Sequence, residues 1–536
     1  MLTDLKQIPV IDLFAGPGGL GEGFSSFRGD DKCHTFKVSL SIEMDDAAHR
    51  TLELRSFFRQ FAPNSAPKDY YLHLRGIITR EELFVLHPKE AAAAKAEAWK
   101  AELGKVDPLE VDRKIVAALA GAKTWILCGG PPCQAYSVMG RSRNGGIDAT
   151  DHRIYLYKEY LRILSVHRPP IFVLENVKGL LSSKVGSSAI FKQMIADLSC
   201  PGEAVGGGKS PDPVYSLFSL VVTPKTQTLD GNPEFSYRDF VIKCEDYGIP
   251  QSRHRVILLG IRRDNVPSLV PTLAPSGRKV SARQVLNGLP RLRSGLSRSK
   301  DGKAEWRQAL AGILTSGALK EIPNGIGNLL RENIRWTLDH LRDIRANRGG
   351  EFIPGGLKSK YRPDWYHDYR IGGVCNHTTR PHMTEDLYRY LFAASFGRLL
   401  GRSPELHDFP NQLLPKHKNV RDKDKKEYFD DRFRVQLAHK PATTVTSHLA
   451  KDGHYYIHYD ETQCRSITVR EAARLQTFPD NYYFCGSRTE QYVQVGNAVP
   501  PLLAYQIAAV VAQVVRGQTV VGKEQTARRA SASIAK

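Results

Sequence analysis

A cysteine and a glutamate, Cys133 and Glu175, each follow a short apolar run of the sequence. Cys133 belongs to a Pro-Pro-Cys-Gln tetrapeptide that comes after the run 124–128 and two glycines, and Glu175 comes directly after the run 171–174. Such runs predict buried strands, and an α/β sheet carries its chemistry where its strands end. A thiol and a carboxyl in these positions suit covalent addition with proton transfer. Because a lone cysteine is more often a small buried hydrophobe, the assignment depends on the residues around it.

Two arginines, Arg253 and Arg255, lie in the stretch Gln-Ser-Arg-His-Arg at 251–255, where we expect a strand. Side chains two positions apart on a strand point to the same face. Beside a thiol and a carboxyl, these guanidinium groups would hold an anionic or carbonyl-bearing substrate and would help the thiol to ionise. A solvated strand face is the alternative interpretation of the same pair.

A glycine-rich turn at 16–21 follows a predicted strand at 8–15, and a second predicted strand at 36–42 ends at Glu43. Strand, glycine turn, helix, strand and acid form the layout of a nucleotide-type binding unit. Glu43 can accept hydrogen bonds from a ribose diol, and Phe14 can face an adenine or a sulfonium. The proline in the turn and the nearby acid favour an adenosyl ligand without phosphates over a dinucleotide. A plain tight turn is the alternative.

These groups need an α/β scaffold, and the order of the expected elements predicts a doubly wound mixed sheet, Rossmann-like, with a second, basic domain. We expect a catalytic and cofactor-binding domain and a separate second domain, followed by a helix that returns to the first domain and a disordered tail. The expected boundaries are 1–263 with an inserted helical hairpin at 81–120, then 264–489, 490–520 and 521–536.

The composition indicates a polyanionic partner. The chain of 536 residues carries a formal charge of +20, and the segment 277–303 holds eight lysines and arginines against one aspartate. Nucleic acid is the first expectation and a membrane surface the second. No apolar stretch approaches the roughly 20 residues that span a bilayer, and the first residues have no signal-peptide layout. The eight scattered cysteines lack a Cys-x-x-Cys pair, which disfavours a zinc module or a disulfide scaffold and favours a reducing cytoplasm.

Two segments near the end of the chain have helix signals. Thr468 and Glu471 form a capping-box pattern that predicts a helix within 465–480. The segment 494–501, Gln-Val-Gly-Asn-Ala-Val-Pro-Pro, leads into an apolar helix with proline at its start. Its Asn497 is either part of a turn before a core helix or a ligand contact.

In this order the segments resemble the DNA cytosine-5 methyltransferase family, of the bacterial modification type. The similarity spans nearly the whole chain apart from the middle basic domain and the tail. The matching pieces are DLFAGPGGL at 12–20, Glu43, GGPPCQAYS at 129–137, ENV at 175–177, QSRHR at 251–255, RSITVREAARLQTFPD at 465–480 and QVGNAVPP at 494–501.

The resemblance implies specific roles. Cys133 would add to C6 of a flipped-out cytosine, Glu175 would bind N3 and the exocyclic amine, and Arg253 and Arg255 would organise the cytosine and the thiolate. The loop after Cys133 would close over the minor groove with Met139 as a wedge, and Asp151 and Arg153 match the segment before the next helix. The resemblance also implies that S-adenosylmethionine is held by Phe14, Gly16, Gly18, Gly19, Leu20, Glu43, Met44, Pro132, Leu156 and Asn497.

The implied enzyme methylates C5 of cytosine at a specific site in double-stranded DNA, for restriction-modification or phage defence. Its expected partners are duplex DNA and a cognate nuclease or defence proteins; we expect a cytoplasmic monomer with no membrane and no metal. An RNA (tRNA) methyltransferase and a catalytically silent DNA-binding regulator are the alternatives. The long basic domain favours DNA, and the retained Cys133 and Glu175 favour an enzyme.

Two departures from the family pattern concern the adenine of the cofactor. The family often has a tryptophan after the cofactor-binding acid, and this chain has Met44. The aspartate that usually contacts the adenine amine is not recognisable between 55 and 120. The resemblance therefore predicts weaker or different stacking on the adenine and leaves the amine contact unassigned.

Overall fold

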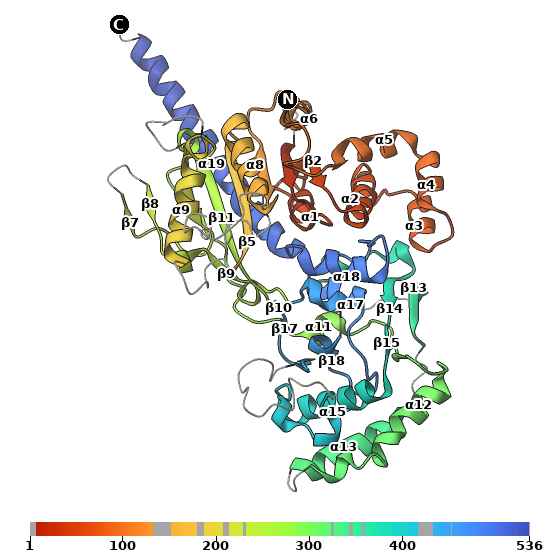
Figure 1. The fold of residues 1–536 in the computed structure, drawn as a ribbon. Helices are drawn as coiled ribbons and strands as arrows, with labels where there is room; N and C mark the ends of the chain where they lie inside the picture. The colour runs from red at the N-terminus through yellow and green to blue at the C-terminus, as the bar shows by residue number, and fades with distance from the viewer. Residues whose placement is uncertain are drawn as a thin grey trace.

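The computed structural model describes residues 7–131, 152–178, 187–206, 214–228, 232–322, 326–341, 347–355, 360–415, 432–451 and 453–534, with side chains except at 152–155, 187–190 and 519–534. Of the residues named above, Pro132, Cys133, Met139 and Asp151 lie outside the described residues. Figure 1 shows an α/β lobe built around one sheet and a second lobe below it.

The sheet of the α/β lobe is mixed, with strands in the order β3-β2-β1-β4-β5-β11-β6 and with β9 also paired to β11. Neighbours among the first five strands are parallel, whereas β11 is antiparallel to β5, β6 and β9. The strands are β1 Ile8–Leu13, β2 Phe36–Glu43, β3 Ala98–Lys100, β4 Ile126–Gly129, β5 Ile171–Val177, β6 Tyr215–Ser219, β9 Val241–Lys243 and β11 His254–Arg262.

Helices cover both faces of the sheet. Neighbouring residues of β1 face opposite layers: Val10 packs in a core with α1 and α19, and Ile11 packs in a core with α6, α8 and α9. Such two-sided burial is why the central strands are continuous apolar runs. The predicted doubly wound mixed sheet is therefore confirmed. The helices are α1 Gly19–Ser26, α2 Asp46–Arg59, α6 Pro108–Leu119, α8 His152–His167, α9 Ser187–Ser199, α10 Pro201–Ala204 and α19 Pro501–Ile534.

The segment predicted as a helical hairpin at 81–120 is not a separate insertion. It contains α4 (Arg80–Leu86), α5 (Pro88–Glu97) and α6, but between α5 and α6 the chain forms β3, which pairs with β2 at the sheet edge. The helix-forming residues continue past Glu97, so local propensity predicts helix there; pairing with β2 overrides it. Together with α3 (Lys68–Leu74), α4 and α5 pack on the second lobe through Ile371 and Cys375.

The second lobe has its own core around Trp306, Leu310, Leu391 and Phe392. Part of the basic segment 277–303 lies inside it, since the buried Arg293 pairs with Asp301 at 2.7 Å. Its elements are α11 Ala282–Leu286, β12 Gly295–Leu296, α12 Lys303–Ala311, α13 Ile326–His340, β13 Gly349–Pro354, α14 Pro363–Tyr366, β14 Gly373–Thr378, β15 Pro381–His382, α15 Thr384–Leu400, β16 Val435–Gln436 and β18 Ile457–His458.

The capped helix predicted from Thr468 and Glu471 is confirmed as α17 (Val469–Leu475), with both hydrogen bonds of the capping box. The sequence did not predict α18 (Arg488–Asn497), which lies between α17 and α19. α19 continues as helix to Ile534, past residue 521, where the sequence predicts a disordered tail. Figure 1 shows its carboxyl end extending away from the α/β lobe.

One apolar stretch within the described residues is long enough to cross a membrane by length and composition, which the sequence analysis did not anticipate. It runs over Arg488–Gln518, and 72% of its apolar window is buried inside the protein. Its buried residues, including Leu503 and Ile507, pack in the core shared with α1 and the sheet. This packing is that of a core helix.

Candidate active site

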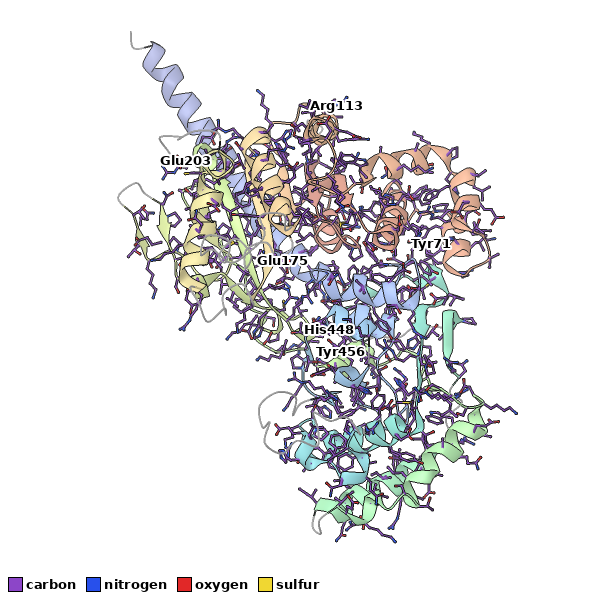
Figure 2. All side chains as sticks on the ribbon, viewed as in Figure 1. Tyr71, Arg113, Glu175, Glu203, His448 and Tyr456 are labelled. Atoms are coloured by element: carbon purple, nitrogen blue, oxygen red, sulfur yellow. The ribbon has the colours of Figure 1, made fainter. Side chains whose placement is uncertain are left out.

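The ends of β4 and β5 meet at the edge of the sheet. Gly129 of β4 lies opposite Leu174 of β5, so that the next residue, Gly130, lies against Glu175. A Cβ at Gly130 would stand 2.7 Å from the carbonyl oxygen of Glu175 and 3.0 Å from its Oε2. Cys133 follows three residues later in the sequence and lies outside the described residues. Figure 2 shows Glu175 on the side of the α/β lobe that faces the second lobe.

Arg255 holds the Glu175 carboxylate. Its Nε lies 3.0 Å from Oε1 of Glu175, with 12% and 14% of the two side chains exposed. On the antiparallel pair of β11 and β5, Arg255 lies opposite Val177, and Ile257 lies opposite Glu175. The arginine and the glutamate are thus diagonal neighbours on adjacent strands, which is within reach of long side chains.

Arg253 has a different environment from Arg255. It lies between β10 (Gln251–Ser252) and β11, so the expected continuous strand is interrupted at this residue. Its side chain is 1% exposed, and its Nη1 donates to the carbonyl oxygens of Val445 at 2.8 Å and Gly496 at 3.1 Å. Burial, together with the nearby Arg255, lowers the pKa of Arg253 to about 9, so it remains charged at neutral pH. Arg253 therefore links the strand ends to the second lobe and to α18.

Glu43 is fixed at the end of β2. Its Oε2 accepts from the N–H of Gly16 at 2.7 Å, and its Oε1 accepts from Met44 at 2.9 Å and Asp45 at 2.8 Å. Burial raises the pKa of Glu43, although the three N–H donors oppose this shift. A carboxylate offers about four acceptor positions. One position on Oε2 is left for a ligand hydroxyl.

The glycine turn has the backbone of a ligand-binding loop. Phe14 has φ 55° and Gly16 has φ 56°, and among the described residues no atom beyond the two chain neighbours lies within 4 Å of the place where a Cβ on Gly16 would stand. A bulky residue in the left-handed region is uncommon and costs free energy, and such residues cluster at binding sites. Met44, which follows Glu43, is 57% exposed beside this space.

The joint between α18 and α19 packs directly on the turn. A Cβ on Gly19 would stand 2.2 Å from the carbonyl oxygen of Val499, so only glycine allows this approach. The joint thus brings the exposed Asn497, the last residue of α18, from the far end of the sequence to this region. Leu20 and Leu156 are each 6% exposed and pack in the two cores below the turn.

A residue that was not predicted from the sequence, Asp12, lies beneath the turn. It is 1% exposed, and its carboxyl oxygens have no hydrogen-bond partner among the described residues. Burial raises the pKa of Asp12 to about 7, while the Gly21 N–H, which is close but lacks hydrogen-bond geometry, and the charge of Arg59 oppose the shift. The sequence signal that could have identified Asp12 is the presence of an acid inside an apolar strand.

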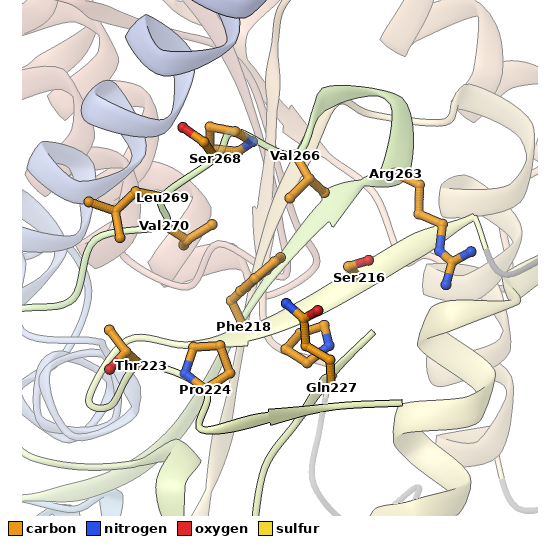
Figure 3. Close-up of a pocket in the computed structure, with 12 residues that line it drawn as sticks. Ser216, Phe218, Thr223, Pro224, Gln227, Arg263, Val266, Ser268, Leu269 and Val270 are labelled. Atoms are coloured by element: carbon orange, nitrogen blue, oxygen red, sulfur yellow. The ribbon is translucent and has the colours of Figure 1, made fainter. Parts of the chain in front are cut away.

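Two cavities are prominent among the described residues, and neither is lined by Glu175 or the glycine turn. One, of about 460 Å³, lies along β6 and includes Phe218, Arg263 and Val270 (Figure 3). The other, of about 680 Å³, lies in the second lobe. Within the described ranges, no group of three or more histidine, cysteine, aspartate or glutamate side chains is placed to hold a metal ion.

Comparisons with known proteins show the family of the chain. A family model described as C-5 cytosine-specific DNA methylase matches residues 96–202 and 227–513. The type II methyltransferase M.Bpa9945I of Bacillus paralicheniformis is 30% identical over 95% of this chain and 99% of its own length. M.DdeI of Desulfomicrobium norvegicum is 26% identical over 93% of this chain and 87% of its own. The DNA (cytosine-5-)-methyltransferase M.ApeKI of Aeropyrum pernix is 25% identical over 77% of this chain and 87% of its own length.

Proposed function

Because the chain belongs to the C-5 cytosine-specific DNA methylase family and is a DNA cytosine-5 methyltransferase, we propose that it methylates C5 of a cytosine flipped out of a specific duplex site. The methyl donor in this proposal is S-adenosylmethionine, and the reaction passes through a covalent adduct with Cys133. The observation that carries the proposal is the Arg255–Glu175 ion pair beside Gly130, at the strand end that leads to Cys133.

In the proposed reaction, addition of Cys133 to the cytosine ring makes C5 nucleophilic. C5 of cytosine is a poor nucleophile until C6 is saturated, and covalent addition divides one difficult step into easier ones. The Cys133 thiolate bonds to C6 while Glu175 stabilises the ring through N3 and the exocyclic amine. After C5 has accepted the methyl group, it loses its proton to a base, the C6–sulfur bond breaks, and the thiolate and the aromatic ring are restored.

The charges around Glu175 support the thiolate form of Cys133. Two guanidinium groups, Arg253 and Arg255, are near one another and near the single carboxylate of Glu175. Their positive charge would lower the cost of a nearby thiolate, which is what a reactive thiol requires. Arg255 also attracts the carboxylate of Glu175 at the strand end. These residues therefore prepare both the nucleophile and the group that binds the base.

The residues around the glycine turn fit S-adenosylmethionine, which when bound supplies an electrophilic methyl group. Glu43 would accept from a ribose hydroxyl with the position left on Oε2, and the backbone of Gly16 leaves open space beside it. The exposed Met44 would flank the adenine, and Phe14 and Asn497 would border the rest. Leu20 and Leu156 would support the pocket from below, and Gly18, with φ 91°, would keep the turn tight.

The second lobe and its flanking helices complete the proposal. The segment 264–489 would serve as the target-recognition domain, and 490–520 would close the cofactor side of the catalytic domain. The charge of +20 suits the phosphates of duplex DNA. The relatives are type II methyltransferases by name, which supports a role in restriction-modification or phage defence. We place this enzyme in the cytoplasm as a monomer.

Bisulfite sequencing of DNA from cells that express the chain tests the reaction. We expect protected cytosines at one recurring sequence. DNA carrying 5-fluorocytosine at that sequence should then trap the protein covalently when S-adenosylmethionine is present, because fluorine cannot leave C5 as a proton does.

A pair of variants makes the trapping test specific. Cys133→Ala should give no adduct and no methylation while it still binds S-adenosylmethionine. Cys33→Ala, which removes an exposed cysteine elsewhere, should behave as the wild type. Methylation by Cys133→Ala would overturn the nucleophile assignment, and recovery of only non-covalent wild-type complexes would favour a DNA-binding regulator.

A further inference from the structure

The cavity of about 680 Å³ in the second lobe lies between α11, the carboxyl end of α15 and the segment 458–463. Its volume is in the range of pockets that hold small ligands or a nucleotide-sized group. Nothing in the proposed reaction uses it. Its lining combines acidic and basic side chains, so the balance between them decides what it can bind.

The acids of this second-lobe cavity are already paired. Asp460 forms an ion pair with Arg291 at 3.2 Å, and the almost fully buried Glu461 pairs with Arg398. Glu471, at the inner wall, is paired with the buried Arg465 and is thereby held ionised. No acid of the described lining is therefore available to neutralise a further cation.

Two basic side chains at the rim of the cavity have no acidic partner among the described residues. The Arg283 side chain has no ion pair or hydrogen bond within the described part of the chain, and Lys440 donates only to the carbonyl oxygen of Gly401 at 2.9 Å. Both residues are exposed. The cavity thus has a positive surplus on long, exposed side chains, which is suited to phosphate oxygens.

Arg398 differs from these two because its guanidinium is held in place. Its carbon Cζ lies 5.4 Å from the ring centroid of Trp336, and Trp336 in turn stacks on His340 at 3.9 Å. The Nη1 of Arg398 donates to Glu461, whose side chain is 4% exposed, whereas that of Arg398 is 51% exposed. A half-exposed guanidinium that is oriented on two sides has lost its freedom before any ligand binds, which favours geometric recognition.

The cavity borders the joint that leads to the candidate active site. Ala282 of α11 donates its N–H to the carbonyl oxygen of Lys440 at 2.9 Å. The strand β17 (Ala442–Thr443) begins two residues after Lys440 and pairs with β10, which comes immediately before Arg253. Figure 1 shows α11 and β17 beside β10, where the two lobes meet. The rim is therefore connected through β17 and β10 to the segment that carries Arg253.

We propose that this second-lobe cavity grips the substrate DNA, with Arg398 reading the edge of a guanine and with Arg283 and Lys440 holding flanking phosphates. The fork of a fixed guanidinium matches O6 and N7 of guanine, the commonest base-specific contact of arginine. Trp336 and Glu461 act as positioning residues for Arg398. The inference rests on the proposed function in one respect, since it takes duplex DNA as the substrate.

Sequence preference tests the role of Arg398. A random-sequence DNA library is methylated by each variant and read by bisulfite sequencing. Arg398→Lys keeps a cation for Glu461 but loses the fork, and we expect it to lower the preference at one base pair by about tenfold while the other positions keep theirs. Trp336→Ala should relax the same position. Thermal denaturation and S-adenosylmethionine binding verify that both variants are folded.

Salt dependence tests the phosphate contacts. DNA binding is measured at several salt concentrations without methyl transfer. Arg283→Gln and Lys440→Gln should each lower the slope of log Kd against log salt by about 1 while the preferred sequence stays the same. Arg113→Gln, an exposed arginine of α6 at the far end of the α/β lobe (Figure 2), is the matched control and should leave the slope unchanged.

Two results would overturn the inference: full site preference in Arg398→Lys and Trp336→Ala, or slopes of the rim variants equal to that of Arg113→Gln. These outcomes differ from a failure of the proposed function. If wild-type protein converts no cytosine but the salt slopes respond to Arg283 and Lys440, DNA gripping stands and the reaction is wrong. If methylation occurs normally and neither slope nor preference changes, the reaction stands and the cavity has no part in DNA binding.

Discussion

Arg255 on β11 and Glu175 on β5 form an ion pair at 3.0 Å across two antiparallel strands. The pair is mostly shielded from solvent, with 12% and 14% of the side chains exposed. Water and salt screen a shielded pair of this kind less than they screen a surface pair. The pair lies beside Gly130, where the chain leaves β4.

The first prediction concerns Glu175→Gln. The amide keeps the size of the side chain but cannot exchange a proton, so we expect methyl transfer to fall by about 100-fold or more. DNA binding should change only a few-fold. Single-turnover transfer of labelled methyl groups measures the first effect, and DNA titration measures the second. Glu234→Gln, on the exposed β8 (Pro233–Glu234), is the control. Equal rates for the two variants would remove Glu175 from the reaction.

The second prediction compares two glycines of the turn. At Gly16 a methyl group enters open space but needs φ 56°, so Gly16→Ala should cost about 1 kcal/mol of unfolding free energy. The same methyl group points into the space assigned to S-adenosylmethionine, so binding should weaken markedly. At Gly19 a Cβ would stand 2.2 Å from the oxygen of Val499, so Gly19→Ala should cost about 3 kcal/mol.

Chemical denaturation and calorimetric titration with S-adenosylmethionine measure the two effects of the glycine variants. A Gly16→Ala protein that binds the cofactor as tightly as the wild type would contradict the location of the pocket. Equal stability of the two variants would contradict the packing of the α18–α19 joint on the turn.

The third prediction follows from the buried carboxyl of Asp12. Its pKa is raised from 3.8 to about 7, so between these pH values the folded protein keeps a proton that the unfolded chain has released. The unfolding free energy therefore falls as the pH rises through this window. Asp12→Asn removes this pH dependence. Between pH 5 and pH 8, its unfolding free energy should fall by roughly 2–3 kcal/mol less than that of the wild type.

Denaturant titrations at a series of pH values check the Asp12 prediction. Asp31→Asn, which changes an exposed acid, should follow the wild-type curve. Parallel curves for Asp12→Asn and the wild type would mean that the Asp12 carboxyl is already ionised or hydrogen-bonded in the folded protein.

The fourth prediction is a gain of affinity at Met44. This side chain is 57% exposed directly after Glu43, and a flat aromatic ring there would stack on the adenine. Met44→Trp should tighten S-adenosylmethionine binding by roughly two- to tenfold. Met44→Ala should bind no better than the wild type. Calorimetric titration separates these outcomes, and weaker binding by Met44→Trp would place the adenine elsewhere.

The sequence by itself determined the local elements of the scaffold and the family to which the chain belongs. Apolar runs predicted strands at β1, β2, β4 and β5, and Thr468 with Glu471 predicted the start of α17. These signals succeed because strand periodicity and helix capping depend on residues within a few positions of one another. The chemical groups at the strand ends could be predicted for the same reason.

The tertiary structure alone decided which of these groups meet. The β3 strand forms at the end of a helix-favouring run because it pairs with β2, more than fifty residues earlier in the chain. Arg253 is buried among carbonyl oxygens of Val445 and Gly496, which are 192 and 243 positions away. Trp336, Arg398 and Glu461 come together from three distant segments. Such long-range contacts depend on how whole elements pack, and no local pattern of residues encodes them.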